Sequence, residues 1–136
     1  MKTSPKMQRV IEQLTKKHSL NLSQAGAHLR LTMPGYHRLV IENIGLRCVS
    51  VAHYFELNGD LVADPDVVFF TGYSEWVPIE ITQVMGIYRR YAELDETEQA
   101  IVRLNLCGQA DLAAFTEEWA QNILEQGWLE QGSVGS

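Results

Sequence analysis

Apolar residues recur three or four positions apart near both ends of the chain, which is the spacing of a helix with one buried face. The first stretch follows Ser4-Pro5, where serine suits a helix cap and proline suits the first turn. The second stretch runs from Ala110 to Gly127. The apolar positions are Met7, Val10, Ile11 and Leu14 in the first, and Leu112, Phe115, Trp119 and Ile123 in the second. The pattern predicts an N-terminal and a C-terminal helix.

Short apolar runs broken by turn residues fill the region between these helices. Such runs are typical of antiparallel strands, and no helix-length segment separates them, as a parallel sheet would require. The expected strands are 28–33, 37–42, 46–57, 60–63, 67–71, 76–82 and 86–92. The expected fold class is therefore α+β, an antiparallel β-meander sheet packed with an N-terminal and a C-terminal helix.

Residues 94–107 fit two descriptions. Asp95 and Glu98 resemble a helix start, whereas Val102 and Leu104 alternate with polar residues as in a strand. We expect a turn and a short strand there. The length suits one domain over residues 1–129, and the glycine and serine content of residues 130–136 suggests a flexible tail.

The loop at Asn43-Ile44-Gly45 predicts how two strands pair. A three-residue loop with Gly45 in the left-handed conformation would place Leu39 opposite Val49. One face would then carry Leu39, Ile41, Val49 and Val51, continued by Phe55 and Leu57.

The segment Asn58-Gly59 suits a two-residue hairpin turn, because both positions of that turn need positive φ. The turn fixes the pairs Leu57 with Asp60, Phe55 with Val62, and His53 with Asp64, all on one face. The opposite face would carry Tyr54, Glu56, Leu61 and Ala63. Pro65 would end the second strand.

A carboxylate beside an imidazole raises the pKa of the histidine and holds its ring, as in many general bases. His53 and Asp64 are therefore the candidate catalytic pair. The same arrangement also satisfies a structural histidine, which we favour because no nucleophile or oxyanion donor is evident beside the pair.

The segment from residue 53 to residue 66 also carries a resemblance. It reads His53-Tyr54-Phe55-Glu56, Asn58-Gly59-Asp60-Leu61 and Asp64-Pro65-Asp66. It resembles a bacterial family of unknown function encoded largely on phages, plasmids and integrative elements. The family signature is His-Tyr-Phe/Tyr-Glu-x-Asn-Gly-Asp-Leu/Met-x-x-Asp-Pro, and the likeness extends over about residues 28–129. The resemblance implies a mobile-element accessory protein and supplies no catalytic residues.

Charge is distributed unevenly along the chain, whose formal net charge is −6. Residues 1–18 sum to +4, whereas residues 93–130 sum to −8. The acidic C-terminal half makes nucleic acid an unlikely partner and favours a basic protein partner. No apolar run is long enough to span a bilayer and no secretory signal is evident, so we expect a cytoplasmic protein without a membrane partner.

No metal or cofactor is expected. The histidines His18, His28, His37 and His53 lack the spacing of a zinc site, and Asp60, Asp64 and Asp66 lack the glycine and glutamate of a calcium loop. Cys48 and Cys107 are too few for a disulfide framework, and Cys48 is expected to be a core residue rather than a nucleophile.

Three hypotheses of function follow. The first is a non-enzymatic protein-interaction module that binds through its acidic C-terminal helix or through the hairpin surface. The hairpin candidates are His53, Tyr54, Glu56, Asn58, Asp60 and Asp64. The second is a small hydrolase or transferase that uses His53 and Asp64. The third is a weak single-strand nucleic-acid binder through Tyr88-Arg89-Arg90-Tyr91, which the net charge disfavours. The sequence does not indicate an oligomeric state.

Overall fold

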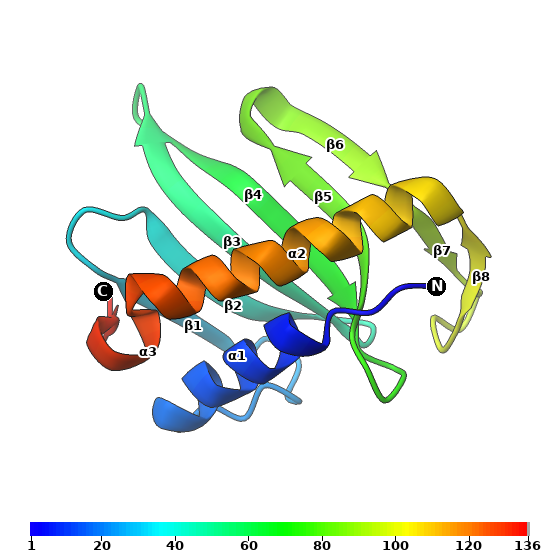
Figure 1. The fold of residues 1–136 in the computed structure, drawn as a ribbon, viewed down its shortest axis with the longest axis horizontal. Helices are drawn as coiled ribbons and strands as arrows, with labels where there is room; N and C mark the ends of the chain where they lie inside the picture. Colours follow the sequence, from blue (N-terminus) through cyan, green and yellow to red (C-terminus); the bar gives the residue numbers. More distant parts are fainter. Residues whose placement is uncertain (136) are drawn as a thin grey trace.

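The structure is a computed structural model that describes residues 1–135. Three α-helices, one short 3-10 helix and nine strands follow one another along the chain (Figure 1). The elements are α1 (Pro5–Lys17), β1 (His28–Thr32), β2 (Arg38–Gly45), β3 (Cys48–Leu57), β4 (Asp60–Phe70), β5 (Val77–Gln83), η1 (Val84–Gly86), β6 (Ile87–Arg90), β7 (Ala92–Leu94), β8 (Ile101–Leu104), α2 (Leu106–Gln126), α3 (Trp128–Gln131) and β9 (Ser133–Val134). The helices within residues 1–135 lack the combination of length and hydropathy that a membrane span requires.

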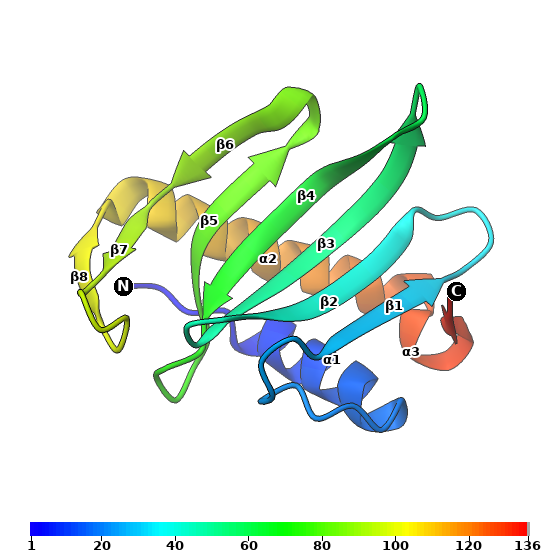
Figure 2. The same ribbon diagram turned by 180° about the vertical axis from the view of Figure 1, so that it is seen from behind.

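Seven strands form one sheet in the order β6-β5-β4-β3-β2-β1-β9, and every neighbouring pair is antiparallel. The helices lie across one face of this sheet (Figure 1), and the view from behind shows the strands uncovered over most of the other face (Figure 2). We call this second face the open face. The expected α+β fold with an N-terminal and a C-terminal helix is confirmed.

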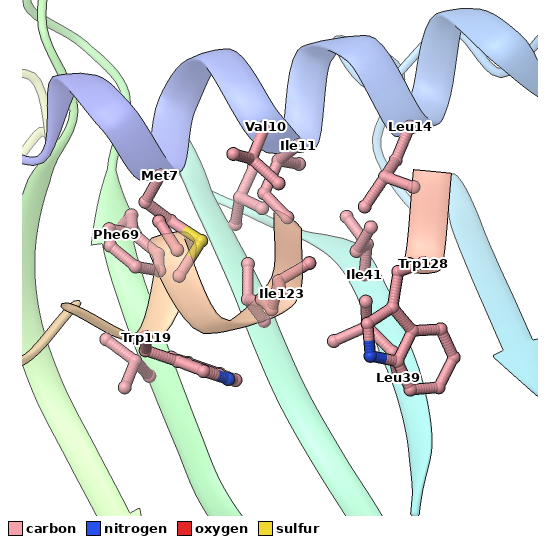
Figure 3. Packing of buried hydrophobic residues seen from close by; sticks show 14 of the residues in the cluster. Met7, Val10, Ile11, Leu14, Leu39, Ile41, Phe69, Trp119, Ile123 and Trp128 are labelled. Atoms are coloured by element: carbon pink, nitrogen blue, oxygen red, sulfur yellow. The ribbon is translucent and has the colours of Figure 1, made fainter. Parts of the chain in front are cut away.

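The main core lies between the helices and the sheet. Side chains of α1 point toward α2 and the strands (Figure 3), where Met7 and Phe69 have no exposed surface. The apolar positions predicted for the two helices are mostly buried here, with Phe115 an exception at 38% exposed. The helical periodicity therefore located the buried faces of α1 and α2.

Hydrogen bonds join the start of α1 to α2. The carboxylate of Glu117 accepts the backbone N–H groups of Lys6 (3.1 Å) and Met7 (3.0 Å), which have no partner within the helix. The Ser4 hydroxyl bonds with that of Thr116 at 2.7 Å instead of capping its own helix. One acidic residue of α2 thus stabilises the fold rather than facing a partner.

The second helix starts at Leu106, four residues before the predicted start at Ala110. The side chain of Asn105 accepts the N–H of Gly108 at 3.0 Å, so an asparagine cap begins the helix earlier than its apolar pattern does. The short strand expected within 94–107 is confirmed as β8.

The predicted register of the β2–β3 hairpin is wrong. Leu39 lies opposite His53 rather than Val49, because the turn is made by Leu46 and Arg47, both with φ 58°, and Gly45 forms a bulge. The shift is an even number of residues, so the side chains keep their faces. Leu39, Ile41, Val49 and Val51 are all buried on the helix side, as expected.

The prediction that β4 ends at Pro65 is also wrong. The strand runs without interruption from Asp60 to Phe70, so the two expected strands 60–63 and 67–71 are one. Its register against β3 shifts between the pairs of Ala52 and Tyr54, and proline is tolerated at such a bulge because the ladder needs no N–H there.

A second, smaller apolar cluster lies on the open face at one end of the sheet, where the hairpin β7–β8 covers it. Its buried members are Cys48, Phe70, Val77, Ile79 and Ala92. The expected strand 86–92 is divided between β6 and β7, so that the chain can leave the large sheet at Tyr91 and fold over this cluster.

The chain turns back on itself after α2. Gly127 ends the helix with φ 90°, as predicted, and Trp128 is fully buried directly after it. Ser133–Val134 pair with β1 as the edge strand β9, whereas the sequence indicated a tail without strands over 130–136. The flexibility of that segment stays a prediction.

Candidate functional site

The imidazole of His53 faces the helices. Its ring centroid lies 5.5 Å from that of Trp119 and 5.9 Å from that of Trp128. Nδ1 lies 3.3 Å from the carbonyl oxygen of His37. The partly buried ring therefore packs against two indoles and lies beside a backbone carbonyl, which is the environment of a packing residue.

The electrostatics of His53 differ from those expected of a base paired with a carboxylate. Burial lowers the pKa of His53 below its ordinary value, and Asp64 contributes only a weak opposing effect. Within residues 1–135, His53 and Asp64 form no ion pair within 4.0 Å. The predicted rise of the histidine pKa toward neutrality is thus wrong, because the indole rings remove water and the bulge in β4 interrupts the pairing beside Asp64.

The tip of the β3–β4 hairpin has the predicted geometry. Asn58 (φ 53°) and Gly59 (φ 84°) adopt the positive φ values of the turn, and Leu57 pairs with Asp60. Asn58 and Asp60 are exposed at this tip, and Asp64 is partly buried lower in the strand.

Tyr54 and Glu56 lie on the face opposite His53, as predicted. They pair with Ala63 and Leu61 in the ladder, and Leu61 is 54% exposed. The six residues proposed from sequence as one binding surface therefore divide between the two faces of the sheet, with His53 on the helix side.

Two adjoining hollows lie beside this hairpin, and the larger one reaches past the open face to His37 and Phe55. One, of about 340 Å³, is lined by residues that include Tyr36, Arg38, Tyr54, Glu56 and Leu61. The other, of about 170 Å³, adds Arg30, Val40 and Glu42. Both hollows share Arg38, Tyr54 and Leu61, and we call the combined surface the hairpin groove.

The charged groups of the hairpin groove are available to a ligand. The ion pairs within residues 1–135 are Arg90 with Glu80 and Arg103 with Glu93, so Arg30 and Arg38 belong to neither. Burial, with the nearby carboxylates of Asp66 and Glu42, raises the pKa of Tyr54. The Tyr54 hydroxyl is therefore a stable hydrogen-bond donor beside an arginine.

Residues 6–129 match the family model described as Domain of unknown function (DUF6908). The chain belongs to this family. Searches of curated proteins and of solved structures each returned no significant match. The family description names no activity, so the groups that this member of the DUF6908 family brings together must carry the functional argument.

No group of three or more histidine, cysteine, aspartate or glutamate side chains within residues 1–135 is placed to hold a metal ion. Cys48 is buried, and burial together with Glu80 and Glu98 raises the pKa of its thiol to about 11. A thiol with that pKa stays protonated at neutral pH and is a poor nucleophile. Cys48 is thus not prepared to act as a nucleophile.

The segment Tyr88-Arg89-Arg90-Tyr91, at the end of β6, does not form one stacking platform. Tyr88 is exposed and its hydroxyl donates to Glu80, which also pairs with Arg90 at 3.7 Å. Tyr91 instead packs against the main core, and its ring lies against Gly108. Glu80 therefore occupies the Tyr88 hydroxyl and the Arg90 guanidinium, two of the polar groups that a nucleic-acid backbone would contact.

Sequence reasoning missed Arg30 and Arg38. They come from β1 and β2, far along the chain from the hairpin tip, and reach the same surface only because β2 lies beside β3 in the sheet and β1 lies beside β2. An available signal was alternation, since Arg30 stands between Leu29 and Leu31 and Arg38 precedes Leu39, so the arginines and the leucines point to opposite faces.

Proposed function

We propose that this domain is a non-enzymatic protein-interaction module, and that its binding surface is the hairpin groove. The observation that carries the proposal is the pair of adjoining hollows that share Arg38, Tyr54 and Leu61 on a sheet face without helices. The place of this module in a mobile-element accessory protein rests on the resemblance of the hairpin sequence alone.

The residue types of the groove support a protein partner. Tyrosine and arginine dominate the binding energy of protein interfaces, and they do so where apolar contacts exclude water around them. Tyr54 and Arg38 lie beside Leu61, which is 54% exposed, and beside Tyr36, which is 46% exposed. A partner side chain in either hollow would cover apolar surface and meet a charged group at once.

The surroundings of His53 weigh against the enzymatic alternative. A general base needs access to substrate and a pKa near the working pH. The pKa of His53 is lowered by burial, and the ring lies between two indoles on the helix side of the sheet. A hydrolase or transferase that uses the pair His53 and Asp64 is therefore not our preferred reading.

The hairpin offers a matched pair of residues for the test. Leu61 faces the groove, whereas Leu57, 48% exposed, lies near it on the other face of the same hairpin. Affinity capture from a host lysate would identify a partner, and titration calorimetry with the purified partner would then compare Leu61→Ser with Leu57→Ser. Thermal melting would establish that both variants fold.

We expect Leu61→Ser to weaken binding about tenfold and Leu57→Ser to change it less than about twofold, because only Leu61 would be covered by the partner. Arg38→Ser should weaken binding as Leu61→Ser does. If both leucine variants bound the partner with the affinity of the wild type, the binding surface would lie outside the hairpin groove.

A further inference from the structure

A separate cavity of about 210 Å³ lies at the other end of the open face, between the β2–β3 turn and the loop joining β7 to β8. Its apolar wall is formed by Ile44, Leu46, Cys48, Val68, Ile79 and Leu94. Pockets for drug-sized ligands have volumes of about 300–1,000 Å³. This cavity is therefore of a size for one side chain rather than for a large cofactor.

Four charged residues line the cavity: Glu80, Arg90, Asp95 and Glu98. Two of them already have partners, since Arg90 lies 3.7 Å from Glu80. Asp95 accepts the N–H of Gln99 at 2.8 Å and the hydroxyl of Thr97 at 3.2 Å. With three carboxylates and one guanidinium, the cavity carries an excess of negative charge.

Glu98 is the exception among these groups. Its Oε2 atom is buried and has no hydrogen-bond partner within residues 1–135. A buried carboxylate oxygen without a donor is unfavourable, and such atoms are rare in folded proteins. Cys48 is part of the apolar wall, and its thiol pKa is raised by burial first and then by the negative charges of Glu80 and Glu98. The carboxylate of Glu98 therefore lies close to this wall.

We propose that this cavity binds the side chain of an arginine from a basic protein partner. The aliphatic stem would lie against the apolar wall, and the guanidinium would donate to the unpaired oxygen of Glu98. Arginine suits both parts, because its stem packs on apolar surface and its planar head bonds carboxylates through several N–H groups. The proposal rests on the proposed function only in taking a protein as the source, and it uses none of the residues of the hairpin groove.

The loop that carries Glu98 also supplies its control. Glu96 is exposed and does not line the cavity, so Glu96→Gln changes the net charge as Glu98→Gln does without touching the site. The probe is N-acetyl-arginine N-methylamide, titrated against the full chain by heteronuclear NMR. The matching citrulline derivative has nearly the same shape and no charge, and the lysine derivative has the charge without the planar head.

We expect the arginine probe to bind with a Kd on the order of millimolar, as for a small fragment of an interface, and to shift the amide signals of residues around the cavity. Glu98→Gln should weaken binding about tenfold, the loss expected for a hydrogen bond to a charged group, and Glu96→Gln should leave it nearly unchanged. The citrulline probe should not bind.

Four results would overturn the proposal. They are no binding of the arginine probe, equal weakening by both glutamate variants, equal binding of the citrulline probe, and tighter binding of the lysine probe, which would reject the guanidinium assignment. None of these results bears on Leu61 and Leu57, so this proposal and the hairpin groove can fail independently.

Discussion

At the scale of single residues, the environment of His53 leads to a prediction about pH. Burial against Trp119 and Trp128 lowers its pKa below the ordinary value of 6.5. As the pH falls below 6.5, the unfolded chain takes up the proton before the folded protein does, so the free energy of unfolding should decrease over that interval. Denaturant unfolding at a series of pH values would measure the decrease.

The variant His53→Gln should lose this part of the pH dependence, whereas His28→Gln, at an exposed position, should retain it. NMR titration of the imidazole would give the pKa directly. A pKa of the imidazole above 6.5 would contradict the effect of burial and would support a pairing of His53 with Asp64.

Asp66 leads to a prediction of opposite sign. It is partly buried on the open face, and burial raises its pKa above 3.8 even though the Ser50 hydroxyl donates to it at 2.6 Å. A raised folded-state pKa means that stability present below pH 3.8 is lost as the pH rises through the folded pKa. The free energy of unfolding of Asp66→Asn at pH 7 should therefore be equal to that of the wild type or higher, because the amide carries no buried charge.

The gain from Asp66→Asn should disappear below pH 3.8, where Asp66 is protonated in both states. Ser50→Ala should instead lower stability at pH 7, because it removes the donor and leaves the carboxylate. A clear loss of stability in Asp66→Asn at pH 7 would mean that the ionised form is the better fit to its site.

At the scale of helices and strands, one carboxylate of α2 caps the start of α1. Glu117 accepts two backbone N–H groups at the start of α1, and the neighbouring Glu118 is exposed. Glu117→Gln should lower the free energy of unfolding by about 1 kcal/mol, since it weakens a cap and removes negative charge from the positive end of a helix. Chemical denaturation of Glu117→Gln and Glu118→Gln would compare them, and equal stabilities would contradict this role.

Turns show where local sequence predicted the structure and where it did not. Asn58-Gly59 determined its hairpin because both residues tolerate positive φ, and the predicted pairs are present. The turn at Leu46 and Arg47 carries no such signal, because neither residue favours the positive φ that it adopts. Long-range packing of the β2–β3 hairpin decides that register, and local propensity does not reveal it.

At the scale of the whole molecule, periodicity predicted the fold class and the buried helix faces, but not the layers. Both helices lie on the same side of the sheet, and β7–β8 crosses to the open face over Cys48 and Phe70. These arrangements depend on contacts between segments far apart in the chain. The same reason explains the candidate site, since the sequence indicated Tyr54 and Glu56 but not Arg30 and Arg38, which only the sheet order brings to them.

The C-terminal segment allows a prediction about how far the cooperative unit extends. Trp128 is fully buried in the main core, whereas β9 contributes two exposed residues to the sheet edge. Deletion of residues 132–136 should therefore cost less than about 1 kcal/mol, and deletion of residues 128–136 about 3 to 5 kcal/mol, as expected for loss of a buried tryptophan. Thermal melting would compare both with the full chain. If the shorter deletion lowered the free energy of unfolding by much more than about 1 kcal/mol, β9 would be part of the cooperative fold. The side chains of β9 are exposed, so its backbone pairing with β1 would then have to account for that loss of stability.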